Sequence, residues 1–229
     1  MRAIFLILFG LASLAELSAH LFHWPDVRLV TKPSLLLLLT AWYITTARQS
    51  NQSLSTMLLA ALIFSWGGDV LLMGTGDLYF MLGLGSFLLA HVFYIFTFRQ
   101  FRNEDETNAL QGLQRIRFAF PIVLFGTGLV IILYPNLGGL TVPVLIYAGV
   151  LTVMVLNALF RFGRTNASSF AYVFGGAILF MISDSVLAIN KFLEPVDGAG
   201  IWIMLTYIAA QFFIAKGLLK HEKSAGGPF

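Results

Sequence analysis

The chain contains no cysteine, and only 11% of its 229 residues are charged. Without cysteine it can form neither a disulfide framework nor a thiolate nucleophile, so its chemistry must come from oxygen and nitrogen groups. Hydrophobic residues make up 58% of the sequence, more than one water-soluble core could hide. The composition therefore predicts that a lipid bilayer is the solvent for most of this chain.

The low positive charge argues against a nucleic-acid-binding protein. The formal net charge is +3, and the basic residues stand at the ends of apolar runs instead of forming one extended patch. Basic residues in such places are typical topology signals of membrane proteins. We therefore expect membrane lipids as partners and no nucleic acid, while the oligomeric partner stays unknown.

Apolar runs bounded by charged residues, proline, glycine and asparagine predict an all-α transmembrane helical bundle of about eight spans. We expect these spans at residues 2–21, 31–48, 54–73, 79–101, 117–134, 140–161, 169–189 and 200–219. Together they make one transmembrane domain, 1–219. The polar, Gly-rich segment 220–229 is expected to be a disordered cytoplasmic tail. Glu16 inside the first apolar run favours a retained helix over a cleaved signal peptide.

The distribution of basic residues predicts how the chain crosses the membrane. An even number of spans puts both termini on one side, which then carries eleven of the fourteen Lys and Arg residues. These eleven are Arg2, Arg48, Arg99, Arg102, Arg115, Arg117, Arg161, Arg164, Lys216, Lys220 and Lys223. The other side has only Arg28, Lys32 and Lys191. Because positive charge favours the cytoplasm, we expect both termini there, in a bacterial-type inner membrane.

Several ionisable or polar side chains fall inside the predicted spans. An ionisable group at hydrocarbon depth costs at least about 2.5 kcal/mol and normally marks a functional site. At a rise of about 1.5 Å per residue, four such groups lie about 6–10 Å inside the outer ends of their spans. They are Glu16, Asp69, Asp184 and Tyr207. Lys32 is expected at the outer mouth of the second span, so five groups from five helices share one outer layer.

Further polar side chains lie deeper. His91 and Gln211 fall about 16–18 Å from the outer ends of their spans, near the midplane. Tyr94 is three residues from His91, so the two share one helix face. Lys32 stands just before Pro33, which suits the first turn of a helix. The simplest arrangement is one polar pocket, open outward or to the outer leaflet, with apolar walls that can hold an acyl chain.

Each of these residues also has a structural interpretation. Glu16 could reach toward the interface beside a neighbouring histidine, and Lys32 could anchor its helix at the membrane surface. His91 could be a core histidine bonded to a neighbouring helix. The structural alternative for Asp69 and Asp184 is a salt bridge with Lys32 or with a helix N-terminus. Two acids at the same depth are, however, a costly way to join helices.

The two acids stand in similar local sequences. Gly68-Asp69-Val70-Leu71-Leu72 lies near the end of the third predicted span, and Ser183-Asp184-Ser185-Val186-Leu187 lies near the end of the seventh. In both segments the acid follows a small residue on a helix that runs outward. This similarity would fit a parallel repeat of four plus four spans.

Short motifs around these polar residues occur in the order and spacing of a known family. They are Thr31-Lys32-Pro33, Phe64-Ser65 with Gly68-Asp69, Ala90-His91-Val92-Phe93-Tyr94, Gly175-Gly176-Ala177, Phe180 with Ser183-Asp184-Ser185, and Tyr207-Ile208-Ala209-Ala210-Gln211. On these motifs the sequence resembles the YhhN-like lysoplasmalogenase family of integral membrane hydrolases across spans two to eight. The resemblance implies hydrolysis of the vinyl ether bond of lysoplasmalogens. The products would be a fatty aldehyde and glycerophosphoethanolamine or glycerophosphocholine.

A vinyl ether is inert to hydroxide but labile to acid, so its hydrolysis needs a general acid beside an anion. Two carboxylates in an apolar pocket can supply both, because burial favours the protonated form and a second carboxylate splits the pair. We expect Asp69 and Asp184 in these roles, and the sequence leaves open which is which. Lys32 could hold the substrate phosphate, and His91 or Tyr207 could position water. The expected substrate-binding set is Glu16, Lys32, His91, Tyr94, Tyr207 and Gln211. No metal ion or other cofactor is expected.

Two rival interpretations stay open. A metal-dependent lipid amidohydrolase would use His91, Asp69 and Asp184 as ligands, although catalytic zinc usually takes several histidines. A proton-coupled lipid or small-solute transporter would use the same acids as a proton relay. Few of the predicted spans are broken by an interior proline, which weakens the transporter interpretation.

Overall fold

The computed structural model describes residues 2–222, and no strand occurs in this part of the chain. Its long helices are α1 (Arg2–Leu21), α2 (Pro25–Gln49), α3 (Thr56–Leu71), α4 (Asp77–Gln100), α5 (Gly112–Leu133), α6 (Thr141–Leu159), α7 (Ala167–Phe192) and α8 (Ala199–Leu219). Two short 3-10 helices, η1 (Tyr134–Asn136) and η2 (Gly138–Leu140), join α5 to α6. The prediction of an all-α bundle is confirmed.

The helices are long and apolar enough to make this chain an integral membrane protein. Seven of them have at least 18 residues and the hydropathy of membrane spans. The remaining long helix, α3, is apolar but has only 16 residues. At about 1.5 Å per residue it is about 24 Å long, shorter than the hydrocarbon core of a typical bilayer.

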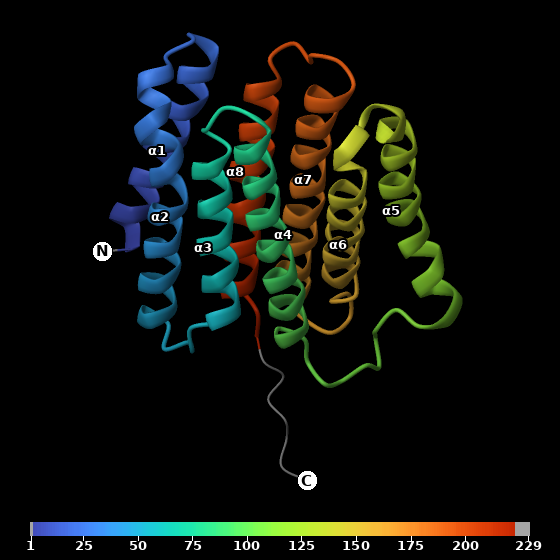
Figure 1. The fold of residues 1–229 in the computed structure, drawn as a ribbon. Coiled ribbons are helices and arrows are strands. Elements are labelled where there is room, and N and C mark those ends of the chain that lie inside the picture. Colours follow the sequence, from blue (N-terminus) through green and yellow to red (C-terminus); the bar gives the residue numbers. More distant parts are fainter. Residues whose placement is uncertain (1, 223–229) are drawn as a thin grey trace.

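Successive helices run in opposite directions through one bundle (Figure 1). The α1–α2, α3–α4, α5–α6 and α7–α8 connections lie at the upper end in Figure 1, and the other three connections lie at the lower end. The two acids predicted to be catalytic stand near the upper ends of α3 and α7, the corresponding helices of the two halves. The four-plus-four repeat and the orientation in the membrane stay predictions.

The start of α2 differs from the prediction. The helix begins at Pro25, with this proline in its first turn, and Pro33 lies inside it. The expectation that Pro33 opens the helix is therefore wrong, and Lys32 lies about two turns inside α2. An interior proline is tolerated in membrane helices where other groups bond the freed backbone. On either side of Pro33 the Thr31 and Ser34 hydroxyls donate to the carbonyl oxygens of Val27 and Val30, one turn earlier, at 3.0 and 2.8 Å.

Antiparallel helix pairs build the bundle, and α8 lies among several of them. The pairs α1–α2, α3–α4 and α7–α8 each pack side by side, and α8 also contacts α1 and α2. At Gly176 of α7, an added Cβ would lie 2.9 Å from the carbonyl oxygen of Ala210, so α7 and α8 approach closely there. Helix α5 lies at the margin of the bundle, against α6 and one part of α7 (Figure 1).

The predicted tail is described only over its first three residues. Lys220 Nζ donates to Ser168 Oγ at 3.3 Å, and His221 Nδ1 lies 2.7 Å from Thr165 Oγ1. These contacts join the end of α8 to the first turn of α7 and to the connection before it. Residues 223–229 of the predicted disordered tail lie outside the described residues.

Candidate active site

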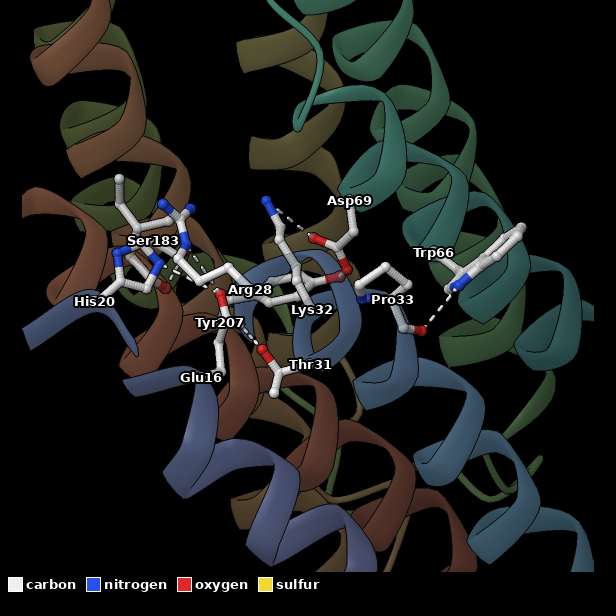
Figure 2. Close-up of polar contacts among 11 residues, drawn as sticks. Glu16, His20, Arg28, Thr31, Lys32, Pro33, Trp66, Asp69, Ser183 and Tyr207 are labelled. Carbon is white, nitrogen blue, oxygen red and sulfur yellow. Dashed lines mark hydrogen bonds and ion pairs between the residues drawn. The ribbon is translucent and has the colours of Figure 1, made fainter. Parts of the chain in front are cut away.

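The first acid, Asp69, is held between α2, α3 and α8. The Tyr207 hydroxyl donates to Asp69 Oδ2 at 2.6 Å, and Lys32 Nζ lies 4.0 Å from Asp69 Oδ1. All three side chains are buried. Trp66 fixes α3 against α2, because its indole donates to the Pro33 carbonyl at 2.9 Å (Figure 2). This bond joins α3 to α2 one residue after Lys32, beside the ion pair between Lys32 and Asp69.

The second acid, Asp184, is held between α4, α6 and α7. The Tyr147 hydroxyl donates to Asp184 Oδ2 at 2.6 Å, and His91 Nε2 lies 3.7 Å from the same oxygen. The His91 ring is fully buried and edge-on to the Tyr147 ring, with centroids 5.2 Å apart. Each aspartate thus accepts one tyrosine hydroxyl, but Asp69 has an ammonium beside it and Asp184 an imidazole.

Both acids line one cavity of about 300 Å³ near the upper end of the bundle. Its polar lining includes Lys32, Asp69, Asp184 and Tyr207, and its mouth includes His20, Arg28, Asn190 and Lys191. We call this space the polar cavity. Ser183 helps to position α7 at this site, because its hydroxyl donates to the Ile203 carbonyl of α8 at 3.0 Å (Figure 2). The structure therefore brings the two predicted catalytic acids to one site.

A second, apolar cavity of about 50 Å³ meets the first at Asp184. It is lined mostly by leucine, valine, alanine and phenylalanine side chains of α4, α5, α6 and α7. We call it the apolar cavity. Asp184 lines both spaces, whereas Asp69 lines only the polar cavity. The two acids consequently differ in their surroundings, one at the boundary between the spaces and one on the polar side.

The deeper polar residues do not reach either cavity. The Tyr94 hydroxyl donates to Gln211 Oε1, and both side chains are fully buried. Gln211 Nε2 and both ring nitrogens of His91 have no hydrogen-bond partner within residues 2–222. Tyr94 and Gln211 join α4 to α8 beneath the polar cavity, as the helix-depth argument predicts. Their role in binding a substrate stays a prediction.

Glu16 lies in a separate buried cluster beside the mouth of the polar cavity. Its carboxylate is 3.3 Å from His20 Nε2 and 3.7 Å from Arg28 Nε, and it accepts a hydrogen bond from Thr31 (Figure 2). Glu16 is fully buried, whereas the Arg28 side chain is 38% exposed. Glu16 therefore orients Arg28 and His20 toward an outer vestibule of about 730 Å³, which His23 and Trp24 also line.

Sequence reasoning missed three residues of this site. Tyr147 stands in an apolar run, where a lone tyrosine is a common packing residue. Arg28 was assigned to a loop, although it is four residues before Lys32 and would share its face once α2 begins at Pro25. Lys191, in the last turn of α7, also lines the mouth. Of the three, only Arg28 could have been found from the sequence, because its spacing of four residues from Lys32 puts both on one helix face.

The alternative metal site is not formed. Within residues 2–222 no three His, Asp or Glu side chains lie close enough together to hold one metal ion. Asp69 is engaged by Tyr207 and Lys32, whereas His91 contacts Asp184.

Comparisons with known proteins agree on one family. Residues 27–218 match the YhhN family. The chain is 31% identical over 163 residues to the lysoplasmalogenase of Mycobacterium tuberculosis, which covers 70% of this chain and 59% of that protein. It is 31% identical over 173 residues to lysoplasmalogenase TMEM86A of Homo sapiens, covering 70% and 64%. No solved structure matches the chain.

The chain therefore spans about three fifths of the length of the curated relatives that it matches. The matched region nevertheless contains every side chain that holds the two acids, from Lys32 on α2 to Tyr207 on α8. On this match, which covers most of its length, the chain belongs to the YhhN family.

Proposed function

We propose that this protein hydrolyses the vinyl ether bond of lysoplasmalogens to a fatty aldehyde and a glycerophospho-head-group alcohol. Relatives named lysoplasmalogenase support the proposal. The observation that carries it is the position of Asp184, which lines both the polar and the apolar cavity, with Asp69 across the polar one. A lysoplasmalogen has the same division, because its vinyl ether joins an apolar chain to a polar glycerophosphate.

The surroundings of the two acids support different roles. Asp69 is the ionised member, because the Lys32 ammonium stands 4.0 Å from it and opposite charge favours a carboxylate. Asp184 is the protonated member and the general acid, since no ammonium or guanidinium is paired with it and it borders the apolar cavity. The first carbons of the alkenyl chain would enter the apolar cavity, whose volume of about 50 Å³ suits only a short part of the chain. The second of these carbons, the β-carbon of the vinyl ether, would then face Asp184.

The reaction then balances with these two groups alone. Asp184 delivers its proton to the β-carbon, and the ether oxygen shares a lone pair to form an oxocarbenium ion. The Asp69 carboxylate stabilises this cation and takes a proton from the water that attacks it, which gives a hemiacetal. Asp69 returns that proton to the glycerol oxygen as the carbon–oxygen bond breaks. The hemiacetal hydroxyl proton passes to Asp184, which restores both acids.

The head-group phosphate would be held at the mouth of the polar cavity. Arg28 and Lys191 line this mouth, and Glu16 fixes the direction of Arg28. Lys32 lies deeper, beside Asp69, so its main effect is on the charge of that carboxylate. His91 contacts Asp184 and has no hydrogen-bond partner within residues 2–222. We therefore assign it the role of keeping this acid in position. A buried side chain that packing holds in one rotamer can keep a reacting group in the productive orientation.

We further infer that the lower end of the bundle faces the cytoplasm. The loops and the adjoining helix ends on that side carry most of the arginines, and basic residues near span ends mark the cytoplasmic side. In a bacterial-type inner membrane the polar cavity would then open toward the outer face. Its substrate would be a lysophospholipid of the outer leaflet.

The test is aldehyde release from lysoplasmenylethanolamine by purified protein. Asp69→Asn and Asp184→Asn should each lower kcat by about 10²- to 10⁴-fold, because asparagine can neither donate a proton nor carry negative charge. The double variant should be scarcely worse than the poorer single variant, since the two groups act as one unit. Near-normal kcat in both single variants would refute the proposal. Elution as a folded species in size-exclusion chromatography controls for misfolding.

The isotopic course of the reaction gives an independent readout. In D₂O the aldehyde should carry a single deuterium on the carbon next to the carbonyl, because the first step is proton transfer to carbon. In H₂¹⁸O the glycerophospho product should contain no label, because the bond between the vinyl carbon and oxygen breaks. Label in that product would place the cleavage on the glycerol side and exclude the mechanism above.

A further inference from the structure

A pocket of about 210 Å³ lies at the lower end of the bundle, opposite to the acids. It is formed by the α4–α5 connection, the first residues of α5 and the turn between α6 and α7. Three arginines line it, Arg102, Arg115 and Arg164, with Glu106 as the one acid of its lining. None of these residues takes part in the proposed hydrolysis.

The arginines of this pocket are not all used to hold the fold together. Arg102 donates through Nη2 to the backbone and side chain of Asn157, at 2.7 and 3.0 Å, but its buried Nε has no partner within residues 2–222. The Arg115 side chain is exposed and makes no hydrogen bond or ion pair in that part of the chain, and its guanidinium lies 4.0 Å over the Phe160 ring. Donors therefore remain for a ligand.

The fully buried Arg161 beside the pocket is a useful contrast. Its guanidinium donates to the carbonyl oxygens of Phe101 and Ser169 and to Ser169 Oγ, at 2.8 to 3.4 Å. Arg161 thus fastens α7 to the end of α4 and lies outside the pocket lining. Arg161 therefore adds positive charge next to the pocket, while the donors of Arg102 and Arg115 that have no partner within residues 2–222 stay available.

Two further observations indicate that an anion suits this pocket. The Glu106 carboxylate already binds Arg164 Nη1 at 2.6 Å, although the Glu106 side chain is 60% exposed. Helix α5 begins at Gly112 in the lining, and no side chain caps its first backbone N–H groups. The start of a helix adds partial positive charge to that of the arginines. Burial and the neighbouring arginines also lower the pKa of Arg102 to about 10, so it stays charged at neutral pH.

We propose that this pocket, which we call the arginine pocket, binds a phosphate monoester group at the lower end of the bundle. Arg102 and Arg115 would bind its oxygens in the bidentate manner that guanidinium favours, and the group would displace Glu106 from Arg164. The group could be carried by a soluble phosphate ester or by the head group of an anionic phospholipid in the lower leaflet. Because α5 also lines the apolar cavity, through Leu129 and Leu133, occupation of the arginine pocket would fix the helix that bounds that cavity.

The test measures phosphate binding by full-length protein in neutral detergent, with isothermal titration of inorganic phosphate against a chloride control. Arg115→Gln should raise the Kd about tenfold, the loss of one charged hydrogen-bonding partner. Glu106→Gln should instead lower the Kd about threefold, because it removes the competing carboxylate. The matched control is Arg117→Gln, exposed on the same helix but absent from the pocket lining, which should leave the Kd unchanged.

A second arm distinguishes the two sources of the phosphate. The protein is placed in nanodiscs of phosphatidylcholine, with or without phosphatidic acid, and its thermal unfolding midpoint is measured. A rise with phosphatidic acid that Arg115→Gln abolishes and Arg117→Gln retains supports a lipid head group. Binding of inorganic phosphate with the same dependence, but no such rise, supports a soluble ester. If Arg115→Gln and Arg117→Gln behave alike in both arms, or Glu106→Gln fails to tighten binding, the arginine pocket is not a phosphate site.

Discussion

Replacement of Lys32 by methionine separates the role expected from the sequence from the role that the structure supports. Lys32 Nζ lies 4.0 Å from Asp69 Oδ1, and the two side chains are 10% and 4% exposed. With an effective dielectric constant of about 20, two unit charges at this distance attract by about 4 kcal/mol. Methionine keeps the length and packing of the lysine chain but removes this attraction, so Asp69 should take up a proton at neutral pH.

A neutral Asp69 can neither stabilise the oxocarbenium ion nor accept the proton of the attacking water. Lys32→Met should therefore lower kcat by about 10²- to 10³-fold, the usual loss when one group that stabilises transition-state charge is removed. KM should change little, because Lys32 would not touch the head group. Combined with Asp69→Asn, the substitution should cause almost no further loss, since both changes remove the same charge.

The assay is steady-state aldehyde release over a range of lysoplasmenylethanolamine concentrations. Lys191→Met is the matched control, because Lys191 lines the mouth of the same cavity. Its one ion pair within residues 2–222 is with Asp77, 3.2 Å away at the exposed start of α4. This substitution should raise KM with kcat nearly intact. A raised KM with normal kcat in Lys32→Met would refute the reasoning and return Lys32 to the phosphate-binding role.

Three further outcomes are expected. A reporter active only in the cytoplasm should work when it is fused after Phe229 or inserted in the α4–α5 connection, and it should fail at Gly138. Reporter activity at Gly138 would show that the inferred orientation is wrong. Ala148→Phe, which intrudes into the apolar cavity, should raise KM for long alkenyl chains more than for short ones, whereas Val153→Phe on the exposed face of α6 should not. Exhaustive chelation should leave aldehyde release intact, because carboxylate acid–base chemistry needs no Lewis acid, and loss of activity that Zn²⁺ restores would contradict this.

The sequence predicts the helices well because bilayer thickness dictates their length. Apolar runs of about 20 residues had few alternatives to membrane helices, and α1 and α8 have the expected bounds to within one residue. Asp69 and Asp184 could be found for a related reason, because an acid inside such a run is rare and costly. The rise per residue of a helix then placed both acids at similar depths in the membrane, which agrees with their position on one polar cavity.

Contacts between helices could not be predicted in the same way. Tyr147 reaches Asp184 because of the rotation and height of α6 against α7, which depend on packing that a single sequence does not reveal. The start of α2 was misplaced because Asp26 and Arg28 resemble loop residues, while Pro25 begins a helix whose first turns carry these charges at the interface. That error put Lys32 at the mouth of the cavity and favoured a phosphate-binding role for it, although its ion pair with Asp69 was one structural alternative.

The short α3 determines where water can meet lipid in this protein. Asp69 stands two residues before its end, and the chain then turns through Gly74 and Gly76 into α4. Because a helix of this length is shorter than the hydrocarbon core, we expect the aqueous boundary to dip toward Asp69, whereas the apolar lining beside Asp184 disfavours water. A lysolipid keeps its own polar and apolar parts on the two sides of such a boundary. It could therefore react without leaving the leaflet in which it resides. Its alkenyl chain would approach the acids from the apolar side, and the water consumed in the reaction would approach from the aqueous side.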